Sequence, residues 1–364
     1  MELTHSYWEQ EEWLNVPDLL IAGGGIVGAS VALFYKKRYP GHDVLLIDKG
    51  VTPEGASTRN AGFACIGSIS EHLADILVSG EEIVLNRIAR RWYGLKRLRE
   101  IVGDASMEYE HTGGFEIFTN LETFYNCQKK IDDLNRQLEK RLGLEEVYSV
   151  KEYEGYPAIF NRVEGAINSG MLMRSLHEKL NELGVRTWWN CRVDEVGEKS
   201  VLINRKLRLK ADQIVLAVNG FVSQLTDIPV EPARGYIFVT EPIQDLKWRG
   251  TFHHNEGYIY FRNIGERLLL GGGRNVARKE ENSDQFGVNP KIKEYLVRFA
   301  GDVLKLPVNW KIDVEWSGIM GMTADKEPVL KQIQPGIWAV AGLSGMGIAV
   351  GMNVARNLVE MIKL

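Results

Sequence analysis

The spacing of apolar residues changes along the chain and divides it into distinct regions. Near the start, a short apolar run at 18–22 meets three glycines, and a second run at 43–48 ends in an aspartate. Residues 26–38 lie between them and predict a helix that stops before Pro40 and Gly41. Short apolar runs separated by a helix indicate parallel strands joined by a helical crossover.

Longer amphipathic patterns follow. Apolar residues at spacings of three and four predict helices at 83–102, 122–142 and 171–183. Aliphatic and β-branched runs predict strands at 185–190, 201–209 and 211–218. The first of these helices is rich in arginine, and we expect its basic residues from Arg87 to Arg99 to form a solvated face.

After residue 229 the pattern changes to short aromatic and aliphatic runs separated by turns, at 236–239, 258–261 and 267–270. Because no helical pattern separates these runs, we expect an antiparallel sheet that is distinct from the first region. The chain then returns to an apolar strand at 337–341, a glycine-rich turn at 342–347 and a helix at 348–362.

Composition and charge narrow the possible functions. The 364 residues are 45% hydrophobic and 25% charged, ordinary proportions for a globular chain of about two domains. A net charge of −4 gives no electrostatic reason to expect nucleic acid binding, and no apolar run is long enough to span a membrane. Three isolated cysteines and an acidic start without an apolar signal core predict a cytoplasmic protein.

The first glycine cluster has the context of a dinucleotide-binding turn. Gly23, Gly25 and Gly28 follow a strand and open a helix, and Asp48 lies twenty residues further on, at the end of the next strand. Such glycines let the backbone approach a pyrophosphate at the helix N-terminus, while the aspartate binds ribose hydroxyls. Lys49 follows without an arginine cluster for a 2′-phosphate, which disfavours NADP.

Two further small-residue segments favour a flavin over a simple nicotinamide. Residues 55–63 (GASTRNAGF) form a polar, glycine-rich stretch after the second strand, which suits a loop that follows an extended cofactor. The turn at 342–348 (GLSGMGI) opens the last helix, whose free N–H groups carry partial positive charge. A reduced flavin needs such charge near N1 and O2.

These segments resemble the FAD-dependent D-amino acid oxidase (DAO) superfamily, in the branch of glycine oxidase, sarcosine oxidase and gamma-glutamylputrescine oxidase. The stretches that carry the resemblance are 55–62, 217–220 (AVNG), 260–262 with 268–274 (YFR and LLLGGGR), 316–318 (WSG), and 323–325 (TAD) with Pro328. They occur in the family's order from residue 18 to residue 358, so that the resemblance covers nearly the whole chain.

The resemblance implies an α/β fold with a discontinuous architecture. A Rossmann-like FAD/NAD(P)-binding domain would comprise residues 1–85, 165–226 and 312–364. An inserted α+β substrate domain, built on an antiparallel sheet, would comprise residues 86–164 and 227–311. Together with the glycine motifs, the resemblance assigns the following residues to FAD: Gly23, Gly25, Ile26, Val27, Gly28, Asp48, Lys49, Ser57, Thr58, Arg59, Asn60, Ala61, Gly62, Val193, Ala217, Asn219, Gly345, Met346, Gly347 and Ile348.

Four positions depart from relatives in this superfamily. Gly318 stands where the sarcosine oxidase branch has the cysteine that binds FAD covalently, so we expect non-covalent FAD. Met320 replaces an arginine and Ala349 replaces a lysine that hold the substrate carboxylate in relatives. A thioether cannot replace a bidentate guanidinium. Leu269 replaces the lysine associated with oxygen, which leaves a dehydrogenase with another electron acceptor open.

We therefore assign substrate contacts to Tyr258, Tyr260 and Arg274, with Arg274 supplying the contact that Met320 cannot; the alternative is sheet packing and a surface ion pair. His253 and His254 lack a third ligand at metal spacing, and we expect a solvated turn and no metal site.

The expected function is oxidation of a C–N bond in an amine or amino acid, by hydride transfer to FAD and hydrolysis of the imine, with electrons passing to oxygen or another acceptor. Two alternatives are a 2-hydroxy acid or polyol dehydrogenase on the same fold, and a flavin-binding protein with little turnover. The sequence leaves the substrate and the oligomeric state open.

Overall fold

A computed structural model describes residues 4–363 and confirms an α/β fold with an additional antiparallel sheet. A six-stranded sheet has the order β18-β19-β12-β1-β2-β8. Its strands are β1 (Leu19–Ala22), β2 (Val44–Ile47), β8 (Arg186–Trp188), β12 (Gln213–Leu216), β18 (Val329–Gln334) and β19 (Ile337–Ala341). Strand β1 pairs in parallel with both β2 and β12, which brings its carboxyl end to the centre of the sheet edge.

The two faces of this sheet are buried against different layers, as its continuous apolar runs require. Leu19, Ile21 and their neighbours pack against a helical layer. In that layer α2 (Ile26–Arg38) packs against α7 (Ser169–Glu182) and α9 (Gly347–Met361), and α9 also packs against the long helix α4 (Glu81–Val102). Leu20 and Leu45 on the other face pack against a three-stranded sheet of β9 (Val193–Gly197), β10 (Ser200–Ile203) and β11 (Leu207–Lys210).

The second large sheet has eight strands in the order β17-β13-β16-β15-β14-β4-β6-β5. Its strands are β4 (Gly114–Ile117), β5 (Tyr148–Tyr153), β6 (Tyr156–Asn161), β13 (Glu231–Thr240), β14 (Thr251–His254), β15 (Ile259–Ile264), β16 (Arg267–Gly272) and β17 (Ile312–Met322). All neighbouring strands run antiparallel except β4 and β14, which run parallel. Helix α8 (Pro290–Asp302) packs its apolar side on this sheet.

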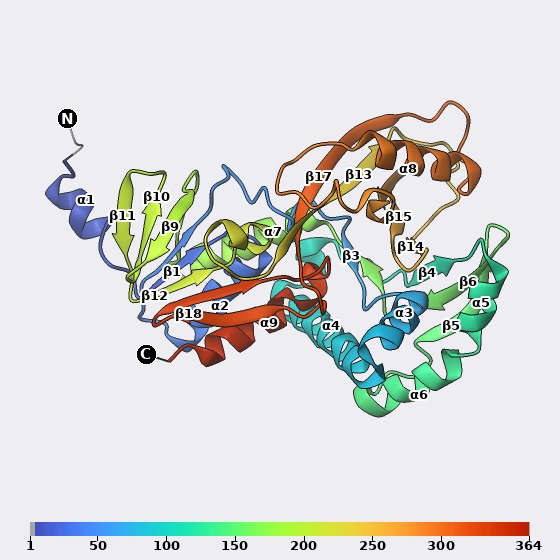
Figure 1. Ribbon diagram of the computed structural model, residues 1–364, viewed down its shortest axis with the longest axis horizontal. Helices are drawn as coiled ribbons and strands as arrows, with labels where there is room; N and C mark the ends of the chain where they lie inside the picture. Colours follow the sequence, from blue (N-terminus) through green and yellow to red (C-terminus); the bar gives the residue numbers. More distant parts are fainter. Residues whose placement is uncertain (1–3, 364) are drawn as a thin grey trace.

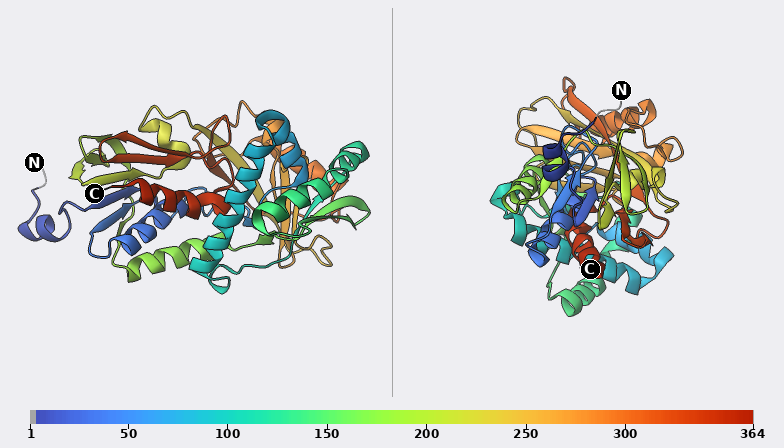
Figure 2. Two further views of the ribbon diagram at one scale, coloured as in Figure 1. Left: turned by 90° about the horizontal axis from the view of Figure 1, so that it is seen from below. Right: turned by 90° about the vertical axis from the view of Figure 1, so that its left-hand side faces the viewer.

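The two large sheets lie towards opposite ends of the molecule, and α4 crosses the region between them (Figures 1 and 2). The remaining elements are α1 (Tyr7–Glu12), α3 (Ile69–Ser79), α5 (Leu121–Gln128), α6 (Ile131–Leu142), the two-stranded β3 (Phe63–Ala64) and β7 (Gly165–Ala166), and the short 3-10 helices at 105–107, 219–224 and 274–277. Residues 312–322 form β17 and pair along their length with β13. The domain limits given above stay a prediction.

Two predicted elements were wrong. The helix expected at 122–142 is two helices, α5 and α6, which are separated at Lys129 and Lys130. Apolar spacing did not reveal the break, because the buried side chains continue at intervals of three and four across it. The strand expected at 201–209 is the hairpin β10–β11, whose strands are connected by residues 204–206. Asn204 and Arg205 both have positive φ, as the central positions of a type I′ turn require.

Within residues 4–363, no helix combines the length and the apolar character that crossing a bilayer requires.

Candidate functional site

A cavity of about 780 Å³ runs along the carboxyl edge of the six-stranded sheet and reaches the eight-stranded sheet. One end is lined by Gly23, Gly25 and Asp48, and the other by Tyr258, Tyr260 and Arg274. We call these the nucleotide end and the substrate end. Its volume lies in the usual range of cofactor sites, about 300–1,000 Å³.

At the nucleotide end, glycine is required because backbone segments approach one another closely. A Cβ atom on Gly23 would lie 2.4 Å from the carbonyl oxygen of Ala217, and one on Gly28 would lie 1.9 Å from that of Gly23. Asp48 accepts hydrogen bonds from the backbone N–H groups of Gly24 (2.7 Å) and Gly50 (2.8 Å). Its carboxylate is therefore fixed at the rim of the cavity.

The segment at 55–63 follows the cavity wall. Ser57 Oγ accepts a hydrogen bond of 2.9 Å from the N–H of Ile26 and so joins this segment to the start of α2. Asn60 folds back on the segment, since its Nδ2 donates to the carbonyl of Ser57 and its Oδ1 accepts from the N–H of Gly62. Arg59 donates to the carbonyl of Ser317 on β17, which ties the segment to the second sheet.

The residues assigned to FAD fall into two groups in the structure. Seventeen of the twenty line the cavity: Gly23, Gly25, Ile26, Val27, Asp48, Lys49, Ser57, Arg59, Asn60, Ala61, Val193, Ala217, Asn219, Gly345, Met346, Gly347 and Ile348. Gly28, Thr58 and Gly62 lie behind its wall. Gly28 allows close packing, Thr58 donates to the carbonyl of Pro53, and Gly62 has a φ of +74° beside Ile167.

The glycine-rich turn before α9 faces the end of β17. Gly345 has a φ of +81°, and a Cβ atom there would lie 3.6 Å from the sulfur of Met320. Met320 also lies against Gly235, so that its thioether fills the space beside the turn. Gly318 and Ala349 line the same part of the cavity, which leaves it without a cysteine or a lysine at these positions.

At the substrate end, Arg274 begins a short 3-10 helix and is separated from the strand β16 by Gly273. The N–H of Gly273 donates to the carbonyl of Tyr258 (2.7 Å), which holds the residues around Arg274 beside Tyr258. One guanidinium nitrogen of Arg274 donates to Oδ1 of Asn282 (2.5 Å). The buried Nε of Arg274 has no hydrogen-bond partner among the described residues. Burial and the neighbouring Arg278 lower the pKa of Arg274.

The sequence did not reveal a second polar group at this end, and the prediction for His253 and His254 was wrong. Both residues lie on β14 rather than in a solvated turn, because the strand continues the alternation of the sheet. His253 is buried, lines the cavity and contacts Glu164 at 2.6 Å between Nε2 and Oε1. Period-2 spacing across Thr251 and His253 was the available signal, although nothing in it points to Glu164.

The expected solvated face of α4 was also wrong for two arginines. Arg87 contacts Asp75 at 2.7 Å, and Arg91 contacts Glu71 at 2.9 Å; both guanidinium groups are buried. The face is buried because α3 packs against α4 and supplies the matching carboxylates. Arg91, Glu71 and Asp75 contribute to the cavity wall, together with Lys326, which contacts Asp75.

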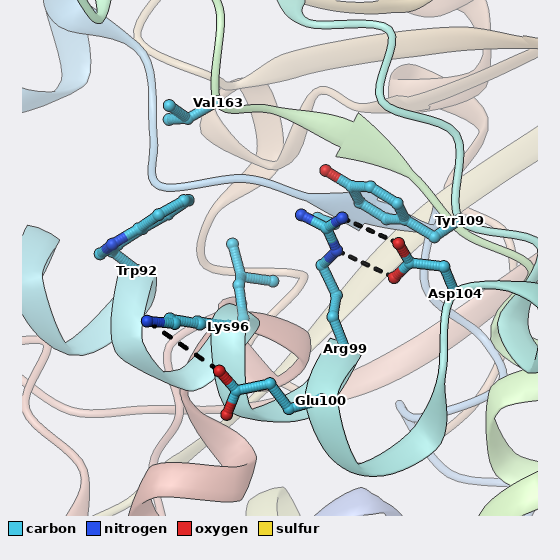
Figure 3. Close-up of a pocket in the computed structure, with 9 residues that line it drawn as sticks. Trp92, Lys96, Arg99, Glu100, Asp104, Tyr109 and Val163 are labelled. Atoms are coloured by element: carbon cyan, nitrogen blue, oxygen red, sulfur yellow. Dashed lines mark hydrogen bonds and ion pairs between the residues drawn. The ribbon is translucent and has the colours of Figure 1, made fainter. Parts of the chain in front are cut away.

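A smaller cavity of about 370 Å³ lies on the other side of β3 (Figure 3). Phe63 lines the large cavity and Ala64 lines the small one, so that this single strand separates the two. Arg99 forms two hydrogen bonds with Asp104 and lies 4.0 Å from the centre of the Tyr109 ring. These contacts account for the charged side chains in its wall.

The nucleotide end fits FAD on its own geometry. Gly23, where a Cβ atom would clash with backbone, lines this end, Asp48 is fixed beside it, and a helix begins there, as a pyrophosphate-binding turn requires. The turn before α9 offers a second helix N-terminus at the position expected for the flavin ring.

Comparisons with known proteins agree with this geometry. Residues 18–361 match the family described as FAD dependent oxidoreductase (DAO). A probable oxidoreductase, OrdL, from Rhizobium meliloti is 22% identical, with 94% of this chain and 82% of that protein covered. Gamma-glutamylputrescine oxidoreductase from Escherichia coli is 21% identical, with 95% and 83% covered. The crystal structure of glycine oxidase from Geobacillus kaustophilus has a TM-score of 0.73 at 19% identity, with 96% and 95% covered.

The family match spans nearly the whole chain, and the cavity has the dinucleotide-binding features described above. This chain therefore belongs to the DAO family of FAD-dependent oxidoreductases.

Proposed function

We propose that this enzyme oxidises the C–N bond of an amine or amino acid that carries an anionic or strongly polar group. The observation that carries the proposal is Arg274, a cation on the wall of the substrate end whose buried Nε lacks a partner within the described chain. A buried guanidinium N–H without an acceptor is costly, and a substrate carboxylate would supply the acceptor. The amine-oxidising relatives named above support the same class of reaction.

The chain's own groups have separate roles in this proposal. The turn that begins at Gly342 and the N-terminus of α9 would direct partial positive charge towards the flavin pyrimidine. Asp48 and the glycines near β1 hold the nucleotide half. Tyr258 and Tyr260 enclose the substrate, and Arg274 binds its polar end. Bound FAD would supply the hydride acceptor for the α-carbon of the substrate, and the imine product would hydrolyse in water.

Non-covalent attachment is part of the proposal. Gly318 stands at the position of the cysteine that binds FAD in the sarcosine oxidase branch. The thiol of Cys65 also lines the cavity, and burial raises its pKa well above the ordinary value. A neutral buried thiol is a poor nucleophile. We expect the flavin to remain in the supernatant after acid precipitation.

The test is an anaerobic titration of the flavin-loaded protein with matched panels of amines, amino acids, 2-hydroxy acids and polyols. We expect loss of the oxidised flavin absorbance with an amine or amino acid. Bleaching by hydroxy acids alone would replace the proposal with C–O oxidation, and bleaching by none would favour a flavin-binding protein with little turnover. Peroxide formation compared with dye reduction then separates oxygen from another acceptor.

A further inference from the structure

A buried histidine and a buried glutamate from distant parts of the chain meet at the substrate end. His253 lies on β14, and Glu164 precedes β7; His253 Nε2 and Glu164 Oε1 are 2.6 Å apart. Their side chains are 10% and 0% exposed. Gly114 provides the space for the carboxylate, since a Cβ atom there would lie 2.4 Å from Glu164 Cδ. The surrounding sheet is therefore shaped around this pair.

The geometry of the pair leaves one imidazole nitrogen available. Since Nε2 contacts Glu164, the neutral ring that donates from Nε2 carries its lone pair on Nδ1. No described residue hydrogen-bonds to Nδ1. His253 stands opposite Tyr260 on the neighbouring strand, and the Phe63 ring packs against both residues. All three residues line the large cavity.

The charged neighbours of His253 determine its proton affinity. Burial by itself would lower the pKa of His253, but the charge and hydrogen bond of Glu164 raise it above its ordinary value, with smaller contributions from Glu116 and Glu71. Glu116 is held by the N–H and hydroxyl of Ser70, and Glu71 pairs with Arg91. The thiol of Cys65 lies beside the pair, with its sulfur within 4.8 Å of an imidazole nitrogen of His253 and of a carboxylate oxygen of Glu164.

We propose that His253 is a catalytic base that accepts the proton an ammonium substrate loses before oxidation, and that Glu164 is its positioning residue; this proposal rests on the proposed function. The N–H bond of the ammonium breaks, its electron pair stays on nitrogen as the free amine, and the proton bonds to Nδ1. The resulting imidazolium is stabilised by the Glu164 carboxylate, and water takes the proton after the product leaves. A carboxylate behind a histidine fixes the tautomer in the same way in serine hydrolases.

The test is the pH dependence of flavin reduction under anaerobic conditions. Glu164→Gln keeps the side-chain shape but removes the charge that raises the pKa of His253. The acid limb of the rate profile should therefore move to lower pH, while a limb due to the substrate amine would stay in place. His253→Gln should slow reduction by about 100-fold or more at neutral pH, within the range for removal of a general base. Unmoved limbs, with rates within about twofold of the parent, would overturn the proposal.

His254→Gln is the matched control. His254 is the next residue on β14, but its ring packs against Phe299 and its Nε2 contacts Thr119, away from the cavity. We expect an unchanged pH profile. Flavin content and unfolding temperature of every variant identify any loss that comes from misfolding rather than from proton transfer.

An NMR titration of the His253 imidazole provides a readout that requires no substrate. Its pKa should lie above that of an ordinary histidine and fall in Glu164→Gln. This measurement is independent of amine oxidation. If amines failed to reduce the flavin, the proposed function would be wrong, but the coupling between His253 and Glu164 would still be established. A pKa unaffected by Glu164→Gln would overturn the proposal. The proposal would also be overturned if the protein bound one equivalent of zinc and lost it on substitution of Cys65, because His253 would then be a metal ligand rather than a base.

Discussion

The two ends of the large cavity are built by different means. The nucleotide end consists of backbone: glycines at close approach, helix N-termini and one fixed carboxylate, all within residues 23–62 and 342–348. The substrate end consists of side chains from segments that are far apart in the chain, such as Glu164 and His253, which lie 89 positions apart. The nucleotide end is therefore defined by local backbone motifs, while the substrate end exists only where distant segments have assembled.

The largest expected effect is at the nucleotide end. Gly28→Ala places a Cβ atom 1.9 Å from a backbone oxygen that cannot move without shifting the turn. We expect a loss of several kcal/mol, at least about 3 kcal/mol, together with loss of FAD. Flavin content per chain and urea unfolding measure both. Gly55→Ala is the control, because nothing lies within 4 Å of its added Cβ atom; equal losses in both variants would contradict the distinction.

The wall near the substrate end depends instead on buried charges. Arg91→Met leaves Glu71, whose side chain is only 18% exposed, without its partner, and we expect a loss near the lower end of the about 3–5 kcal/mol that breaking a buried pair costs. Urea unfolding should show this loss, and the double variant Arg91→Met with Glu71→Met should recover part of it. A loss below about 1 kcal/mol would mean that water reaches the carboxylate.

Acid should weaken the same region in two stages. Burial lowers the pKa of His72 from 6.5 to about 4. Between these two pH values the unfolded chain binds a proton at His72 and the folded chain does not. Stability should therefore fall as pH decreases from 6.5 towards 4. Burial by itself would raise the pKa of Glu71, but the charge and hydrogen bond of Arg91 and the other nearby cations together lower it from 4.5 to about 2. The stability that Glu71 contributes is therefore lost as the pH falls from 4.5 towards 2. Thermal unfolding against pH tests the order, and His72→Gln should flatten the first stage.

The smallest change is expected from Arg274→Met, which should alter binding but not folding. Loss of a charged hydrogen bond worth about 1.5–3 kcal/mol predicts a rise in KM of about 10- to 100-fold. Steady-state kinetics with the substrate identified by titration measures it, and Arg278→Met gives a neighbouring control on the same cavity wall. An unchanged KM would mean that Arg274 does not bind the substrate and has only a structural role.

The difference between the two ends also explains what the sequence could predict. The positions of the glycine motif and Asp48 could be predicted, because the strand, turn and helix that place them are contiguous in the sequence. Pairing of His253 with Glu164 depends on the register of β14 beside β4, which no local pattern encodes. The burial of Arg87 and Arg91 was missed for the same reason, since the acidic partners lie on another helix.

The strand order of the six-stranded sheet has a consequence for synthesis of the chain. Strand β1, at residues 19–22, lies between β2 and β12, and β12 pairs with β19 at residues 337–341. During synthesis β2 can therefore pair with β1 early, while the other edge of β1 stays unpaired until β12 has been made, and β12 gains β19 later still. Contacts of such long sequence separation form slowly. FAD, by binding the completed site, would favour the assembled sheet by mass action.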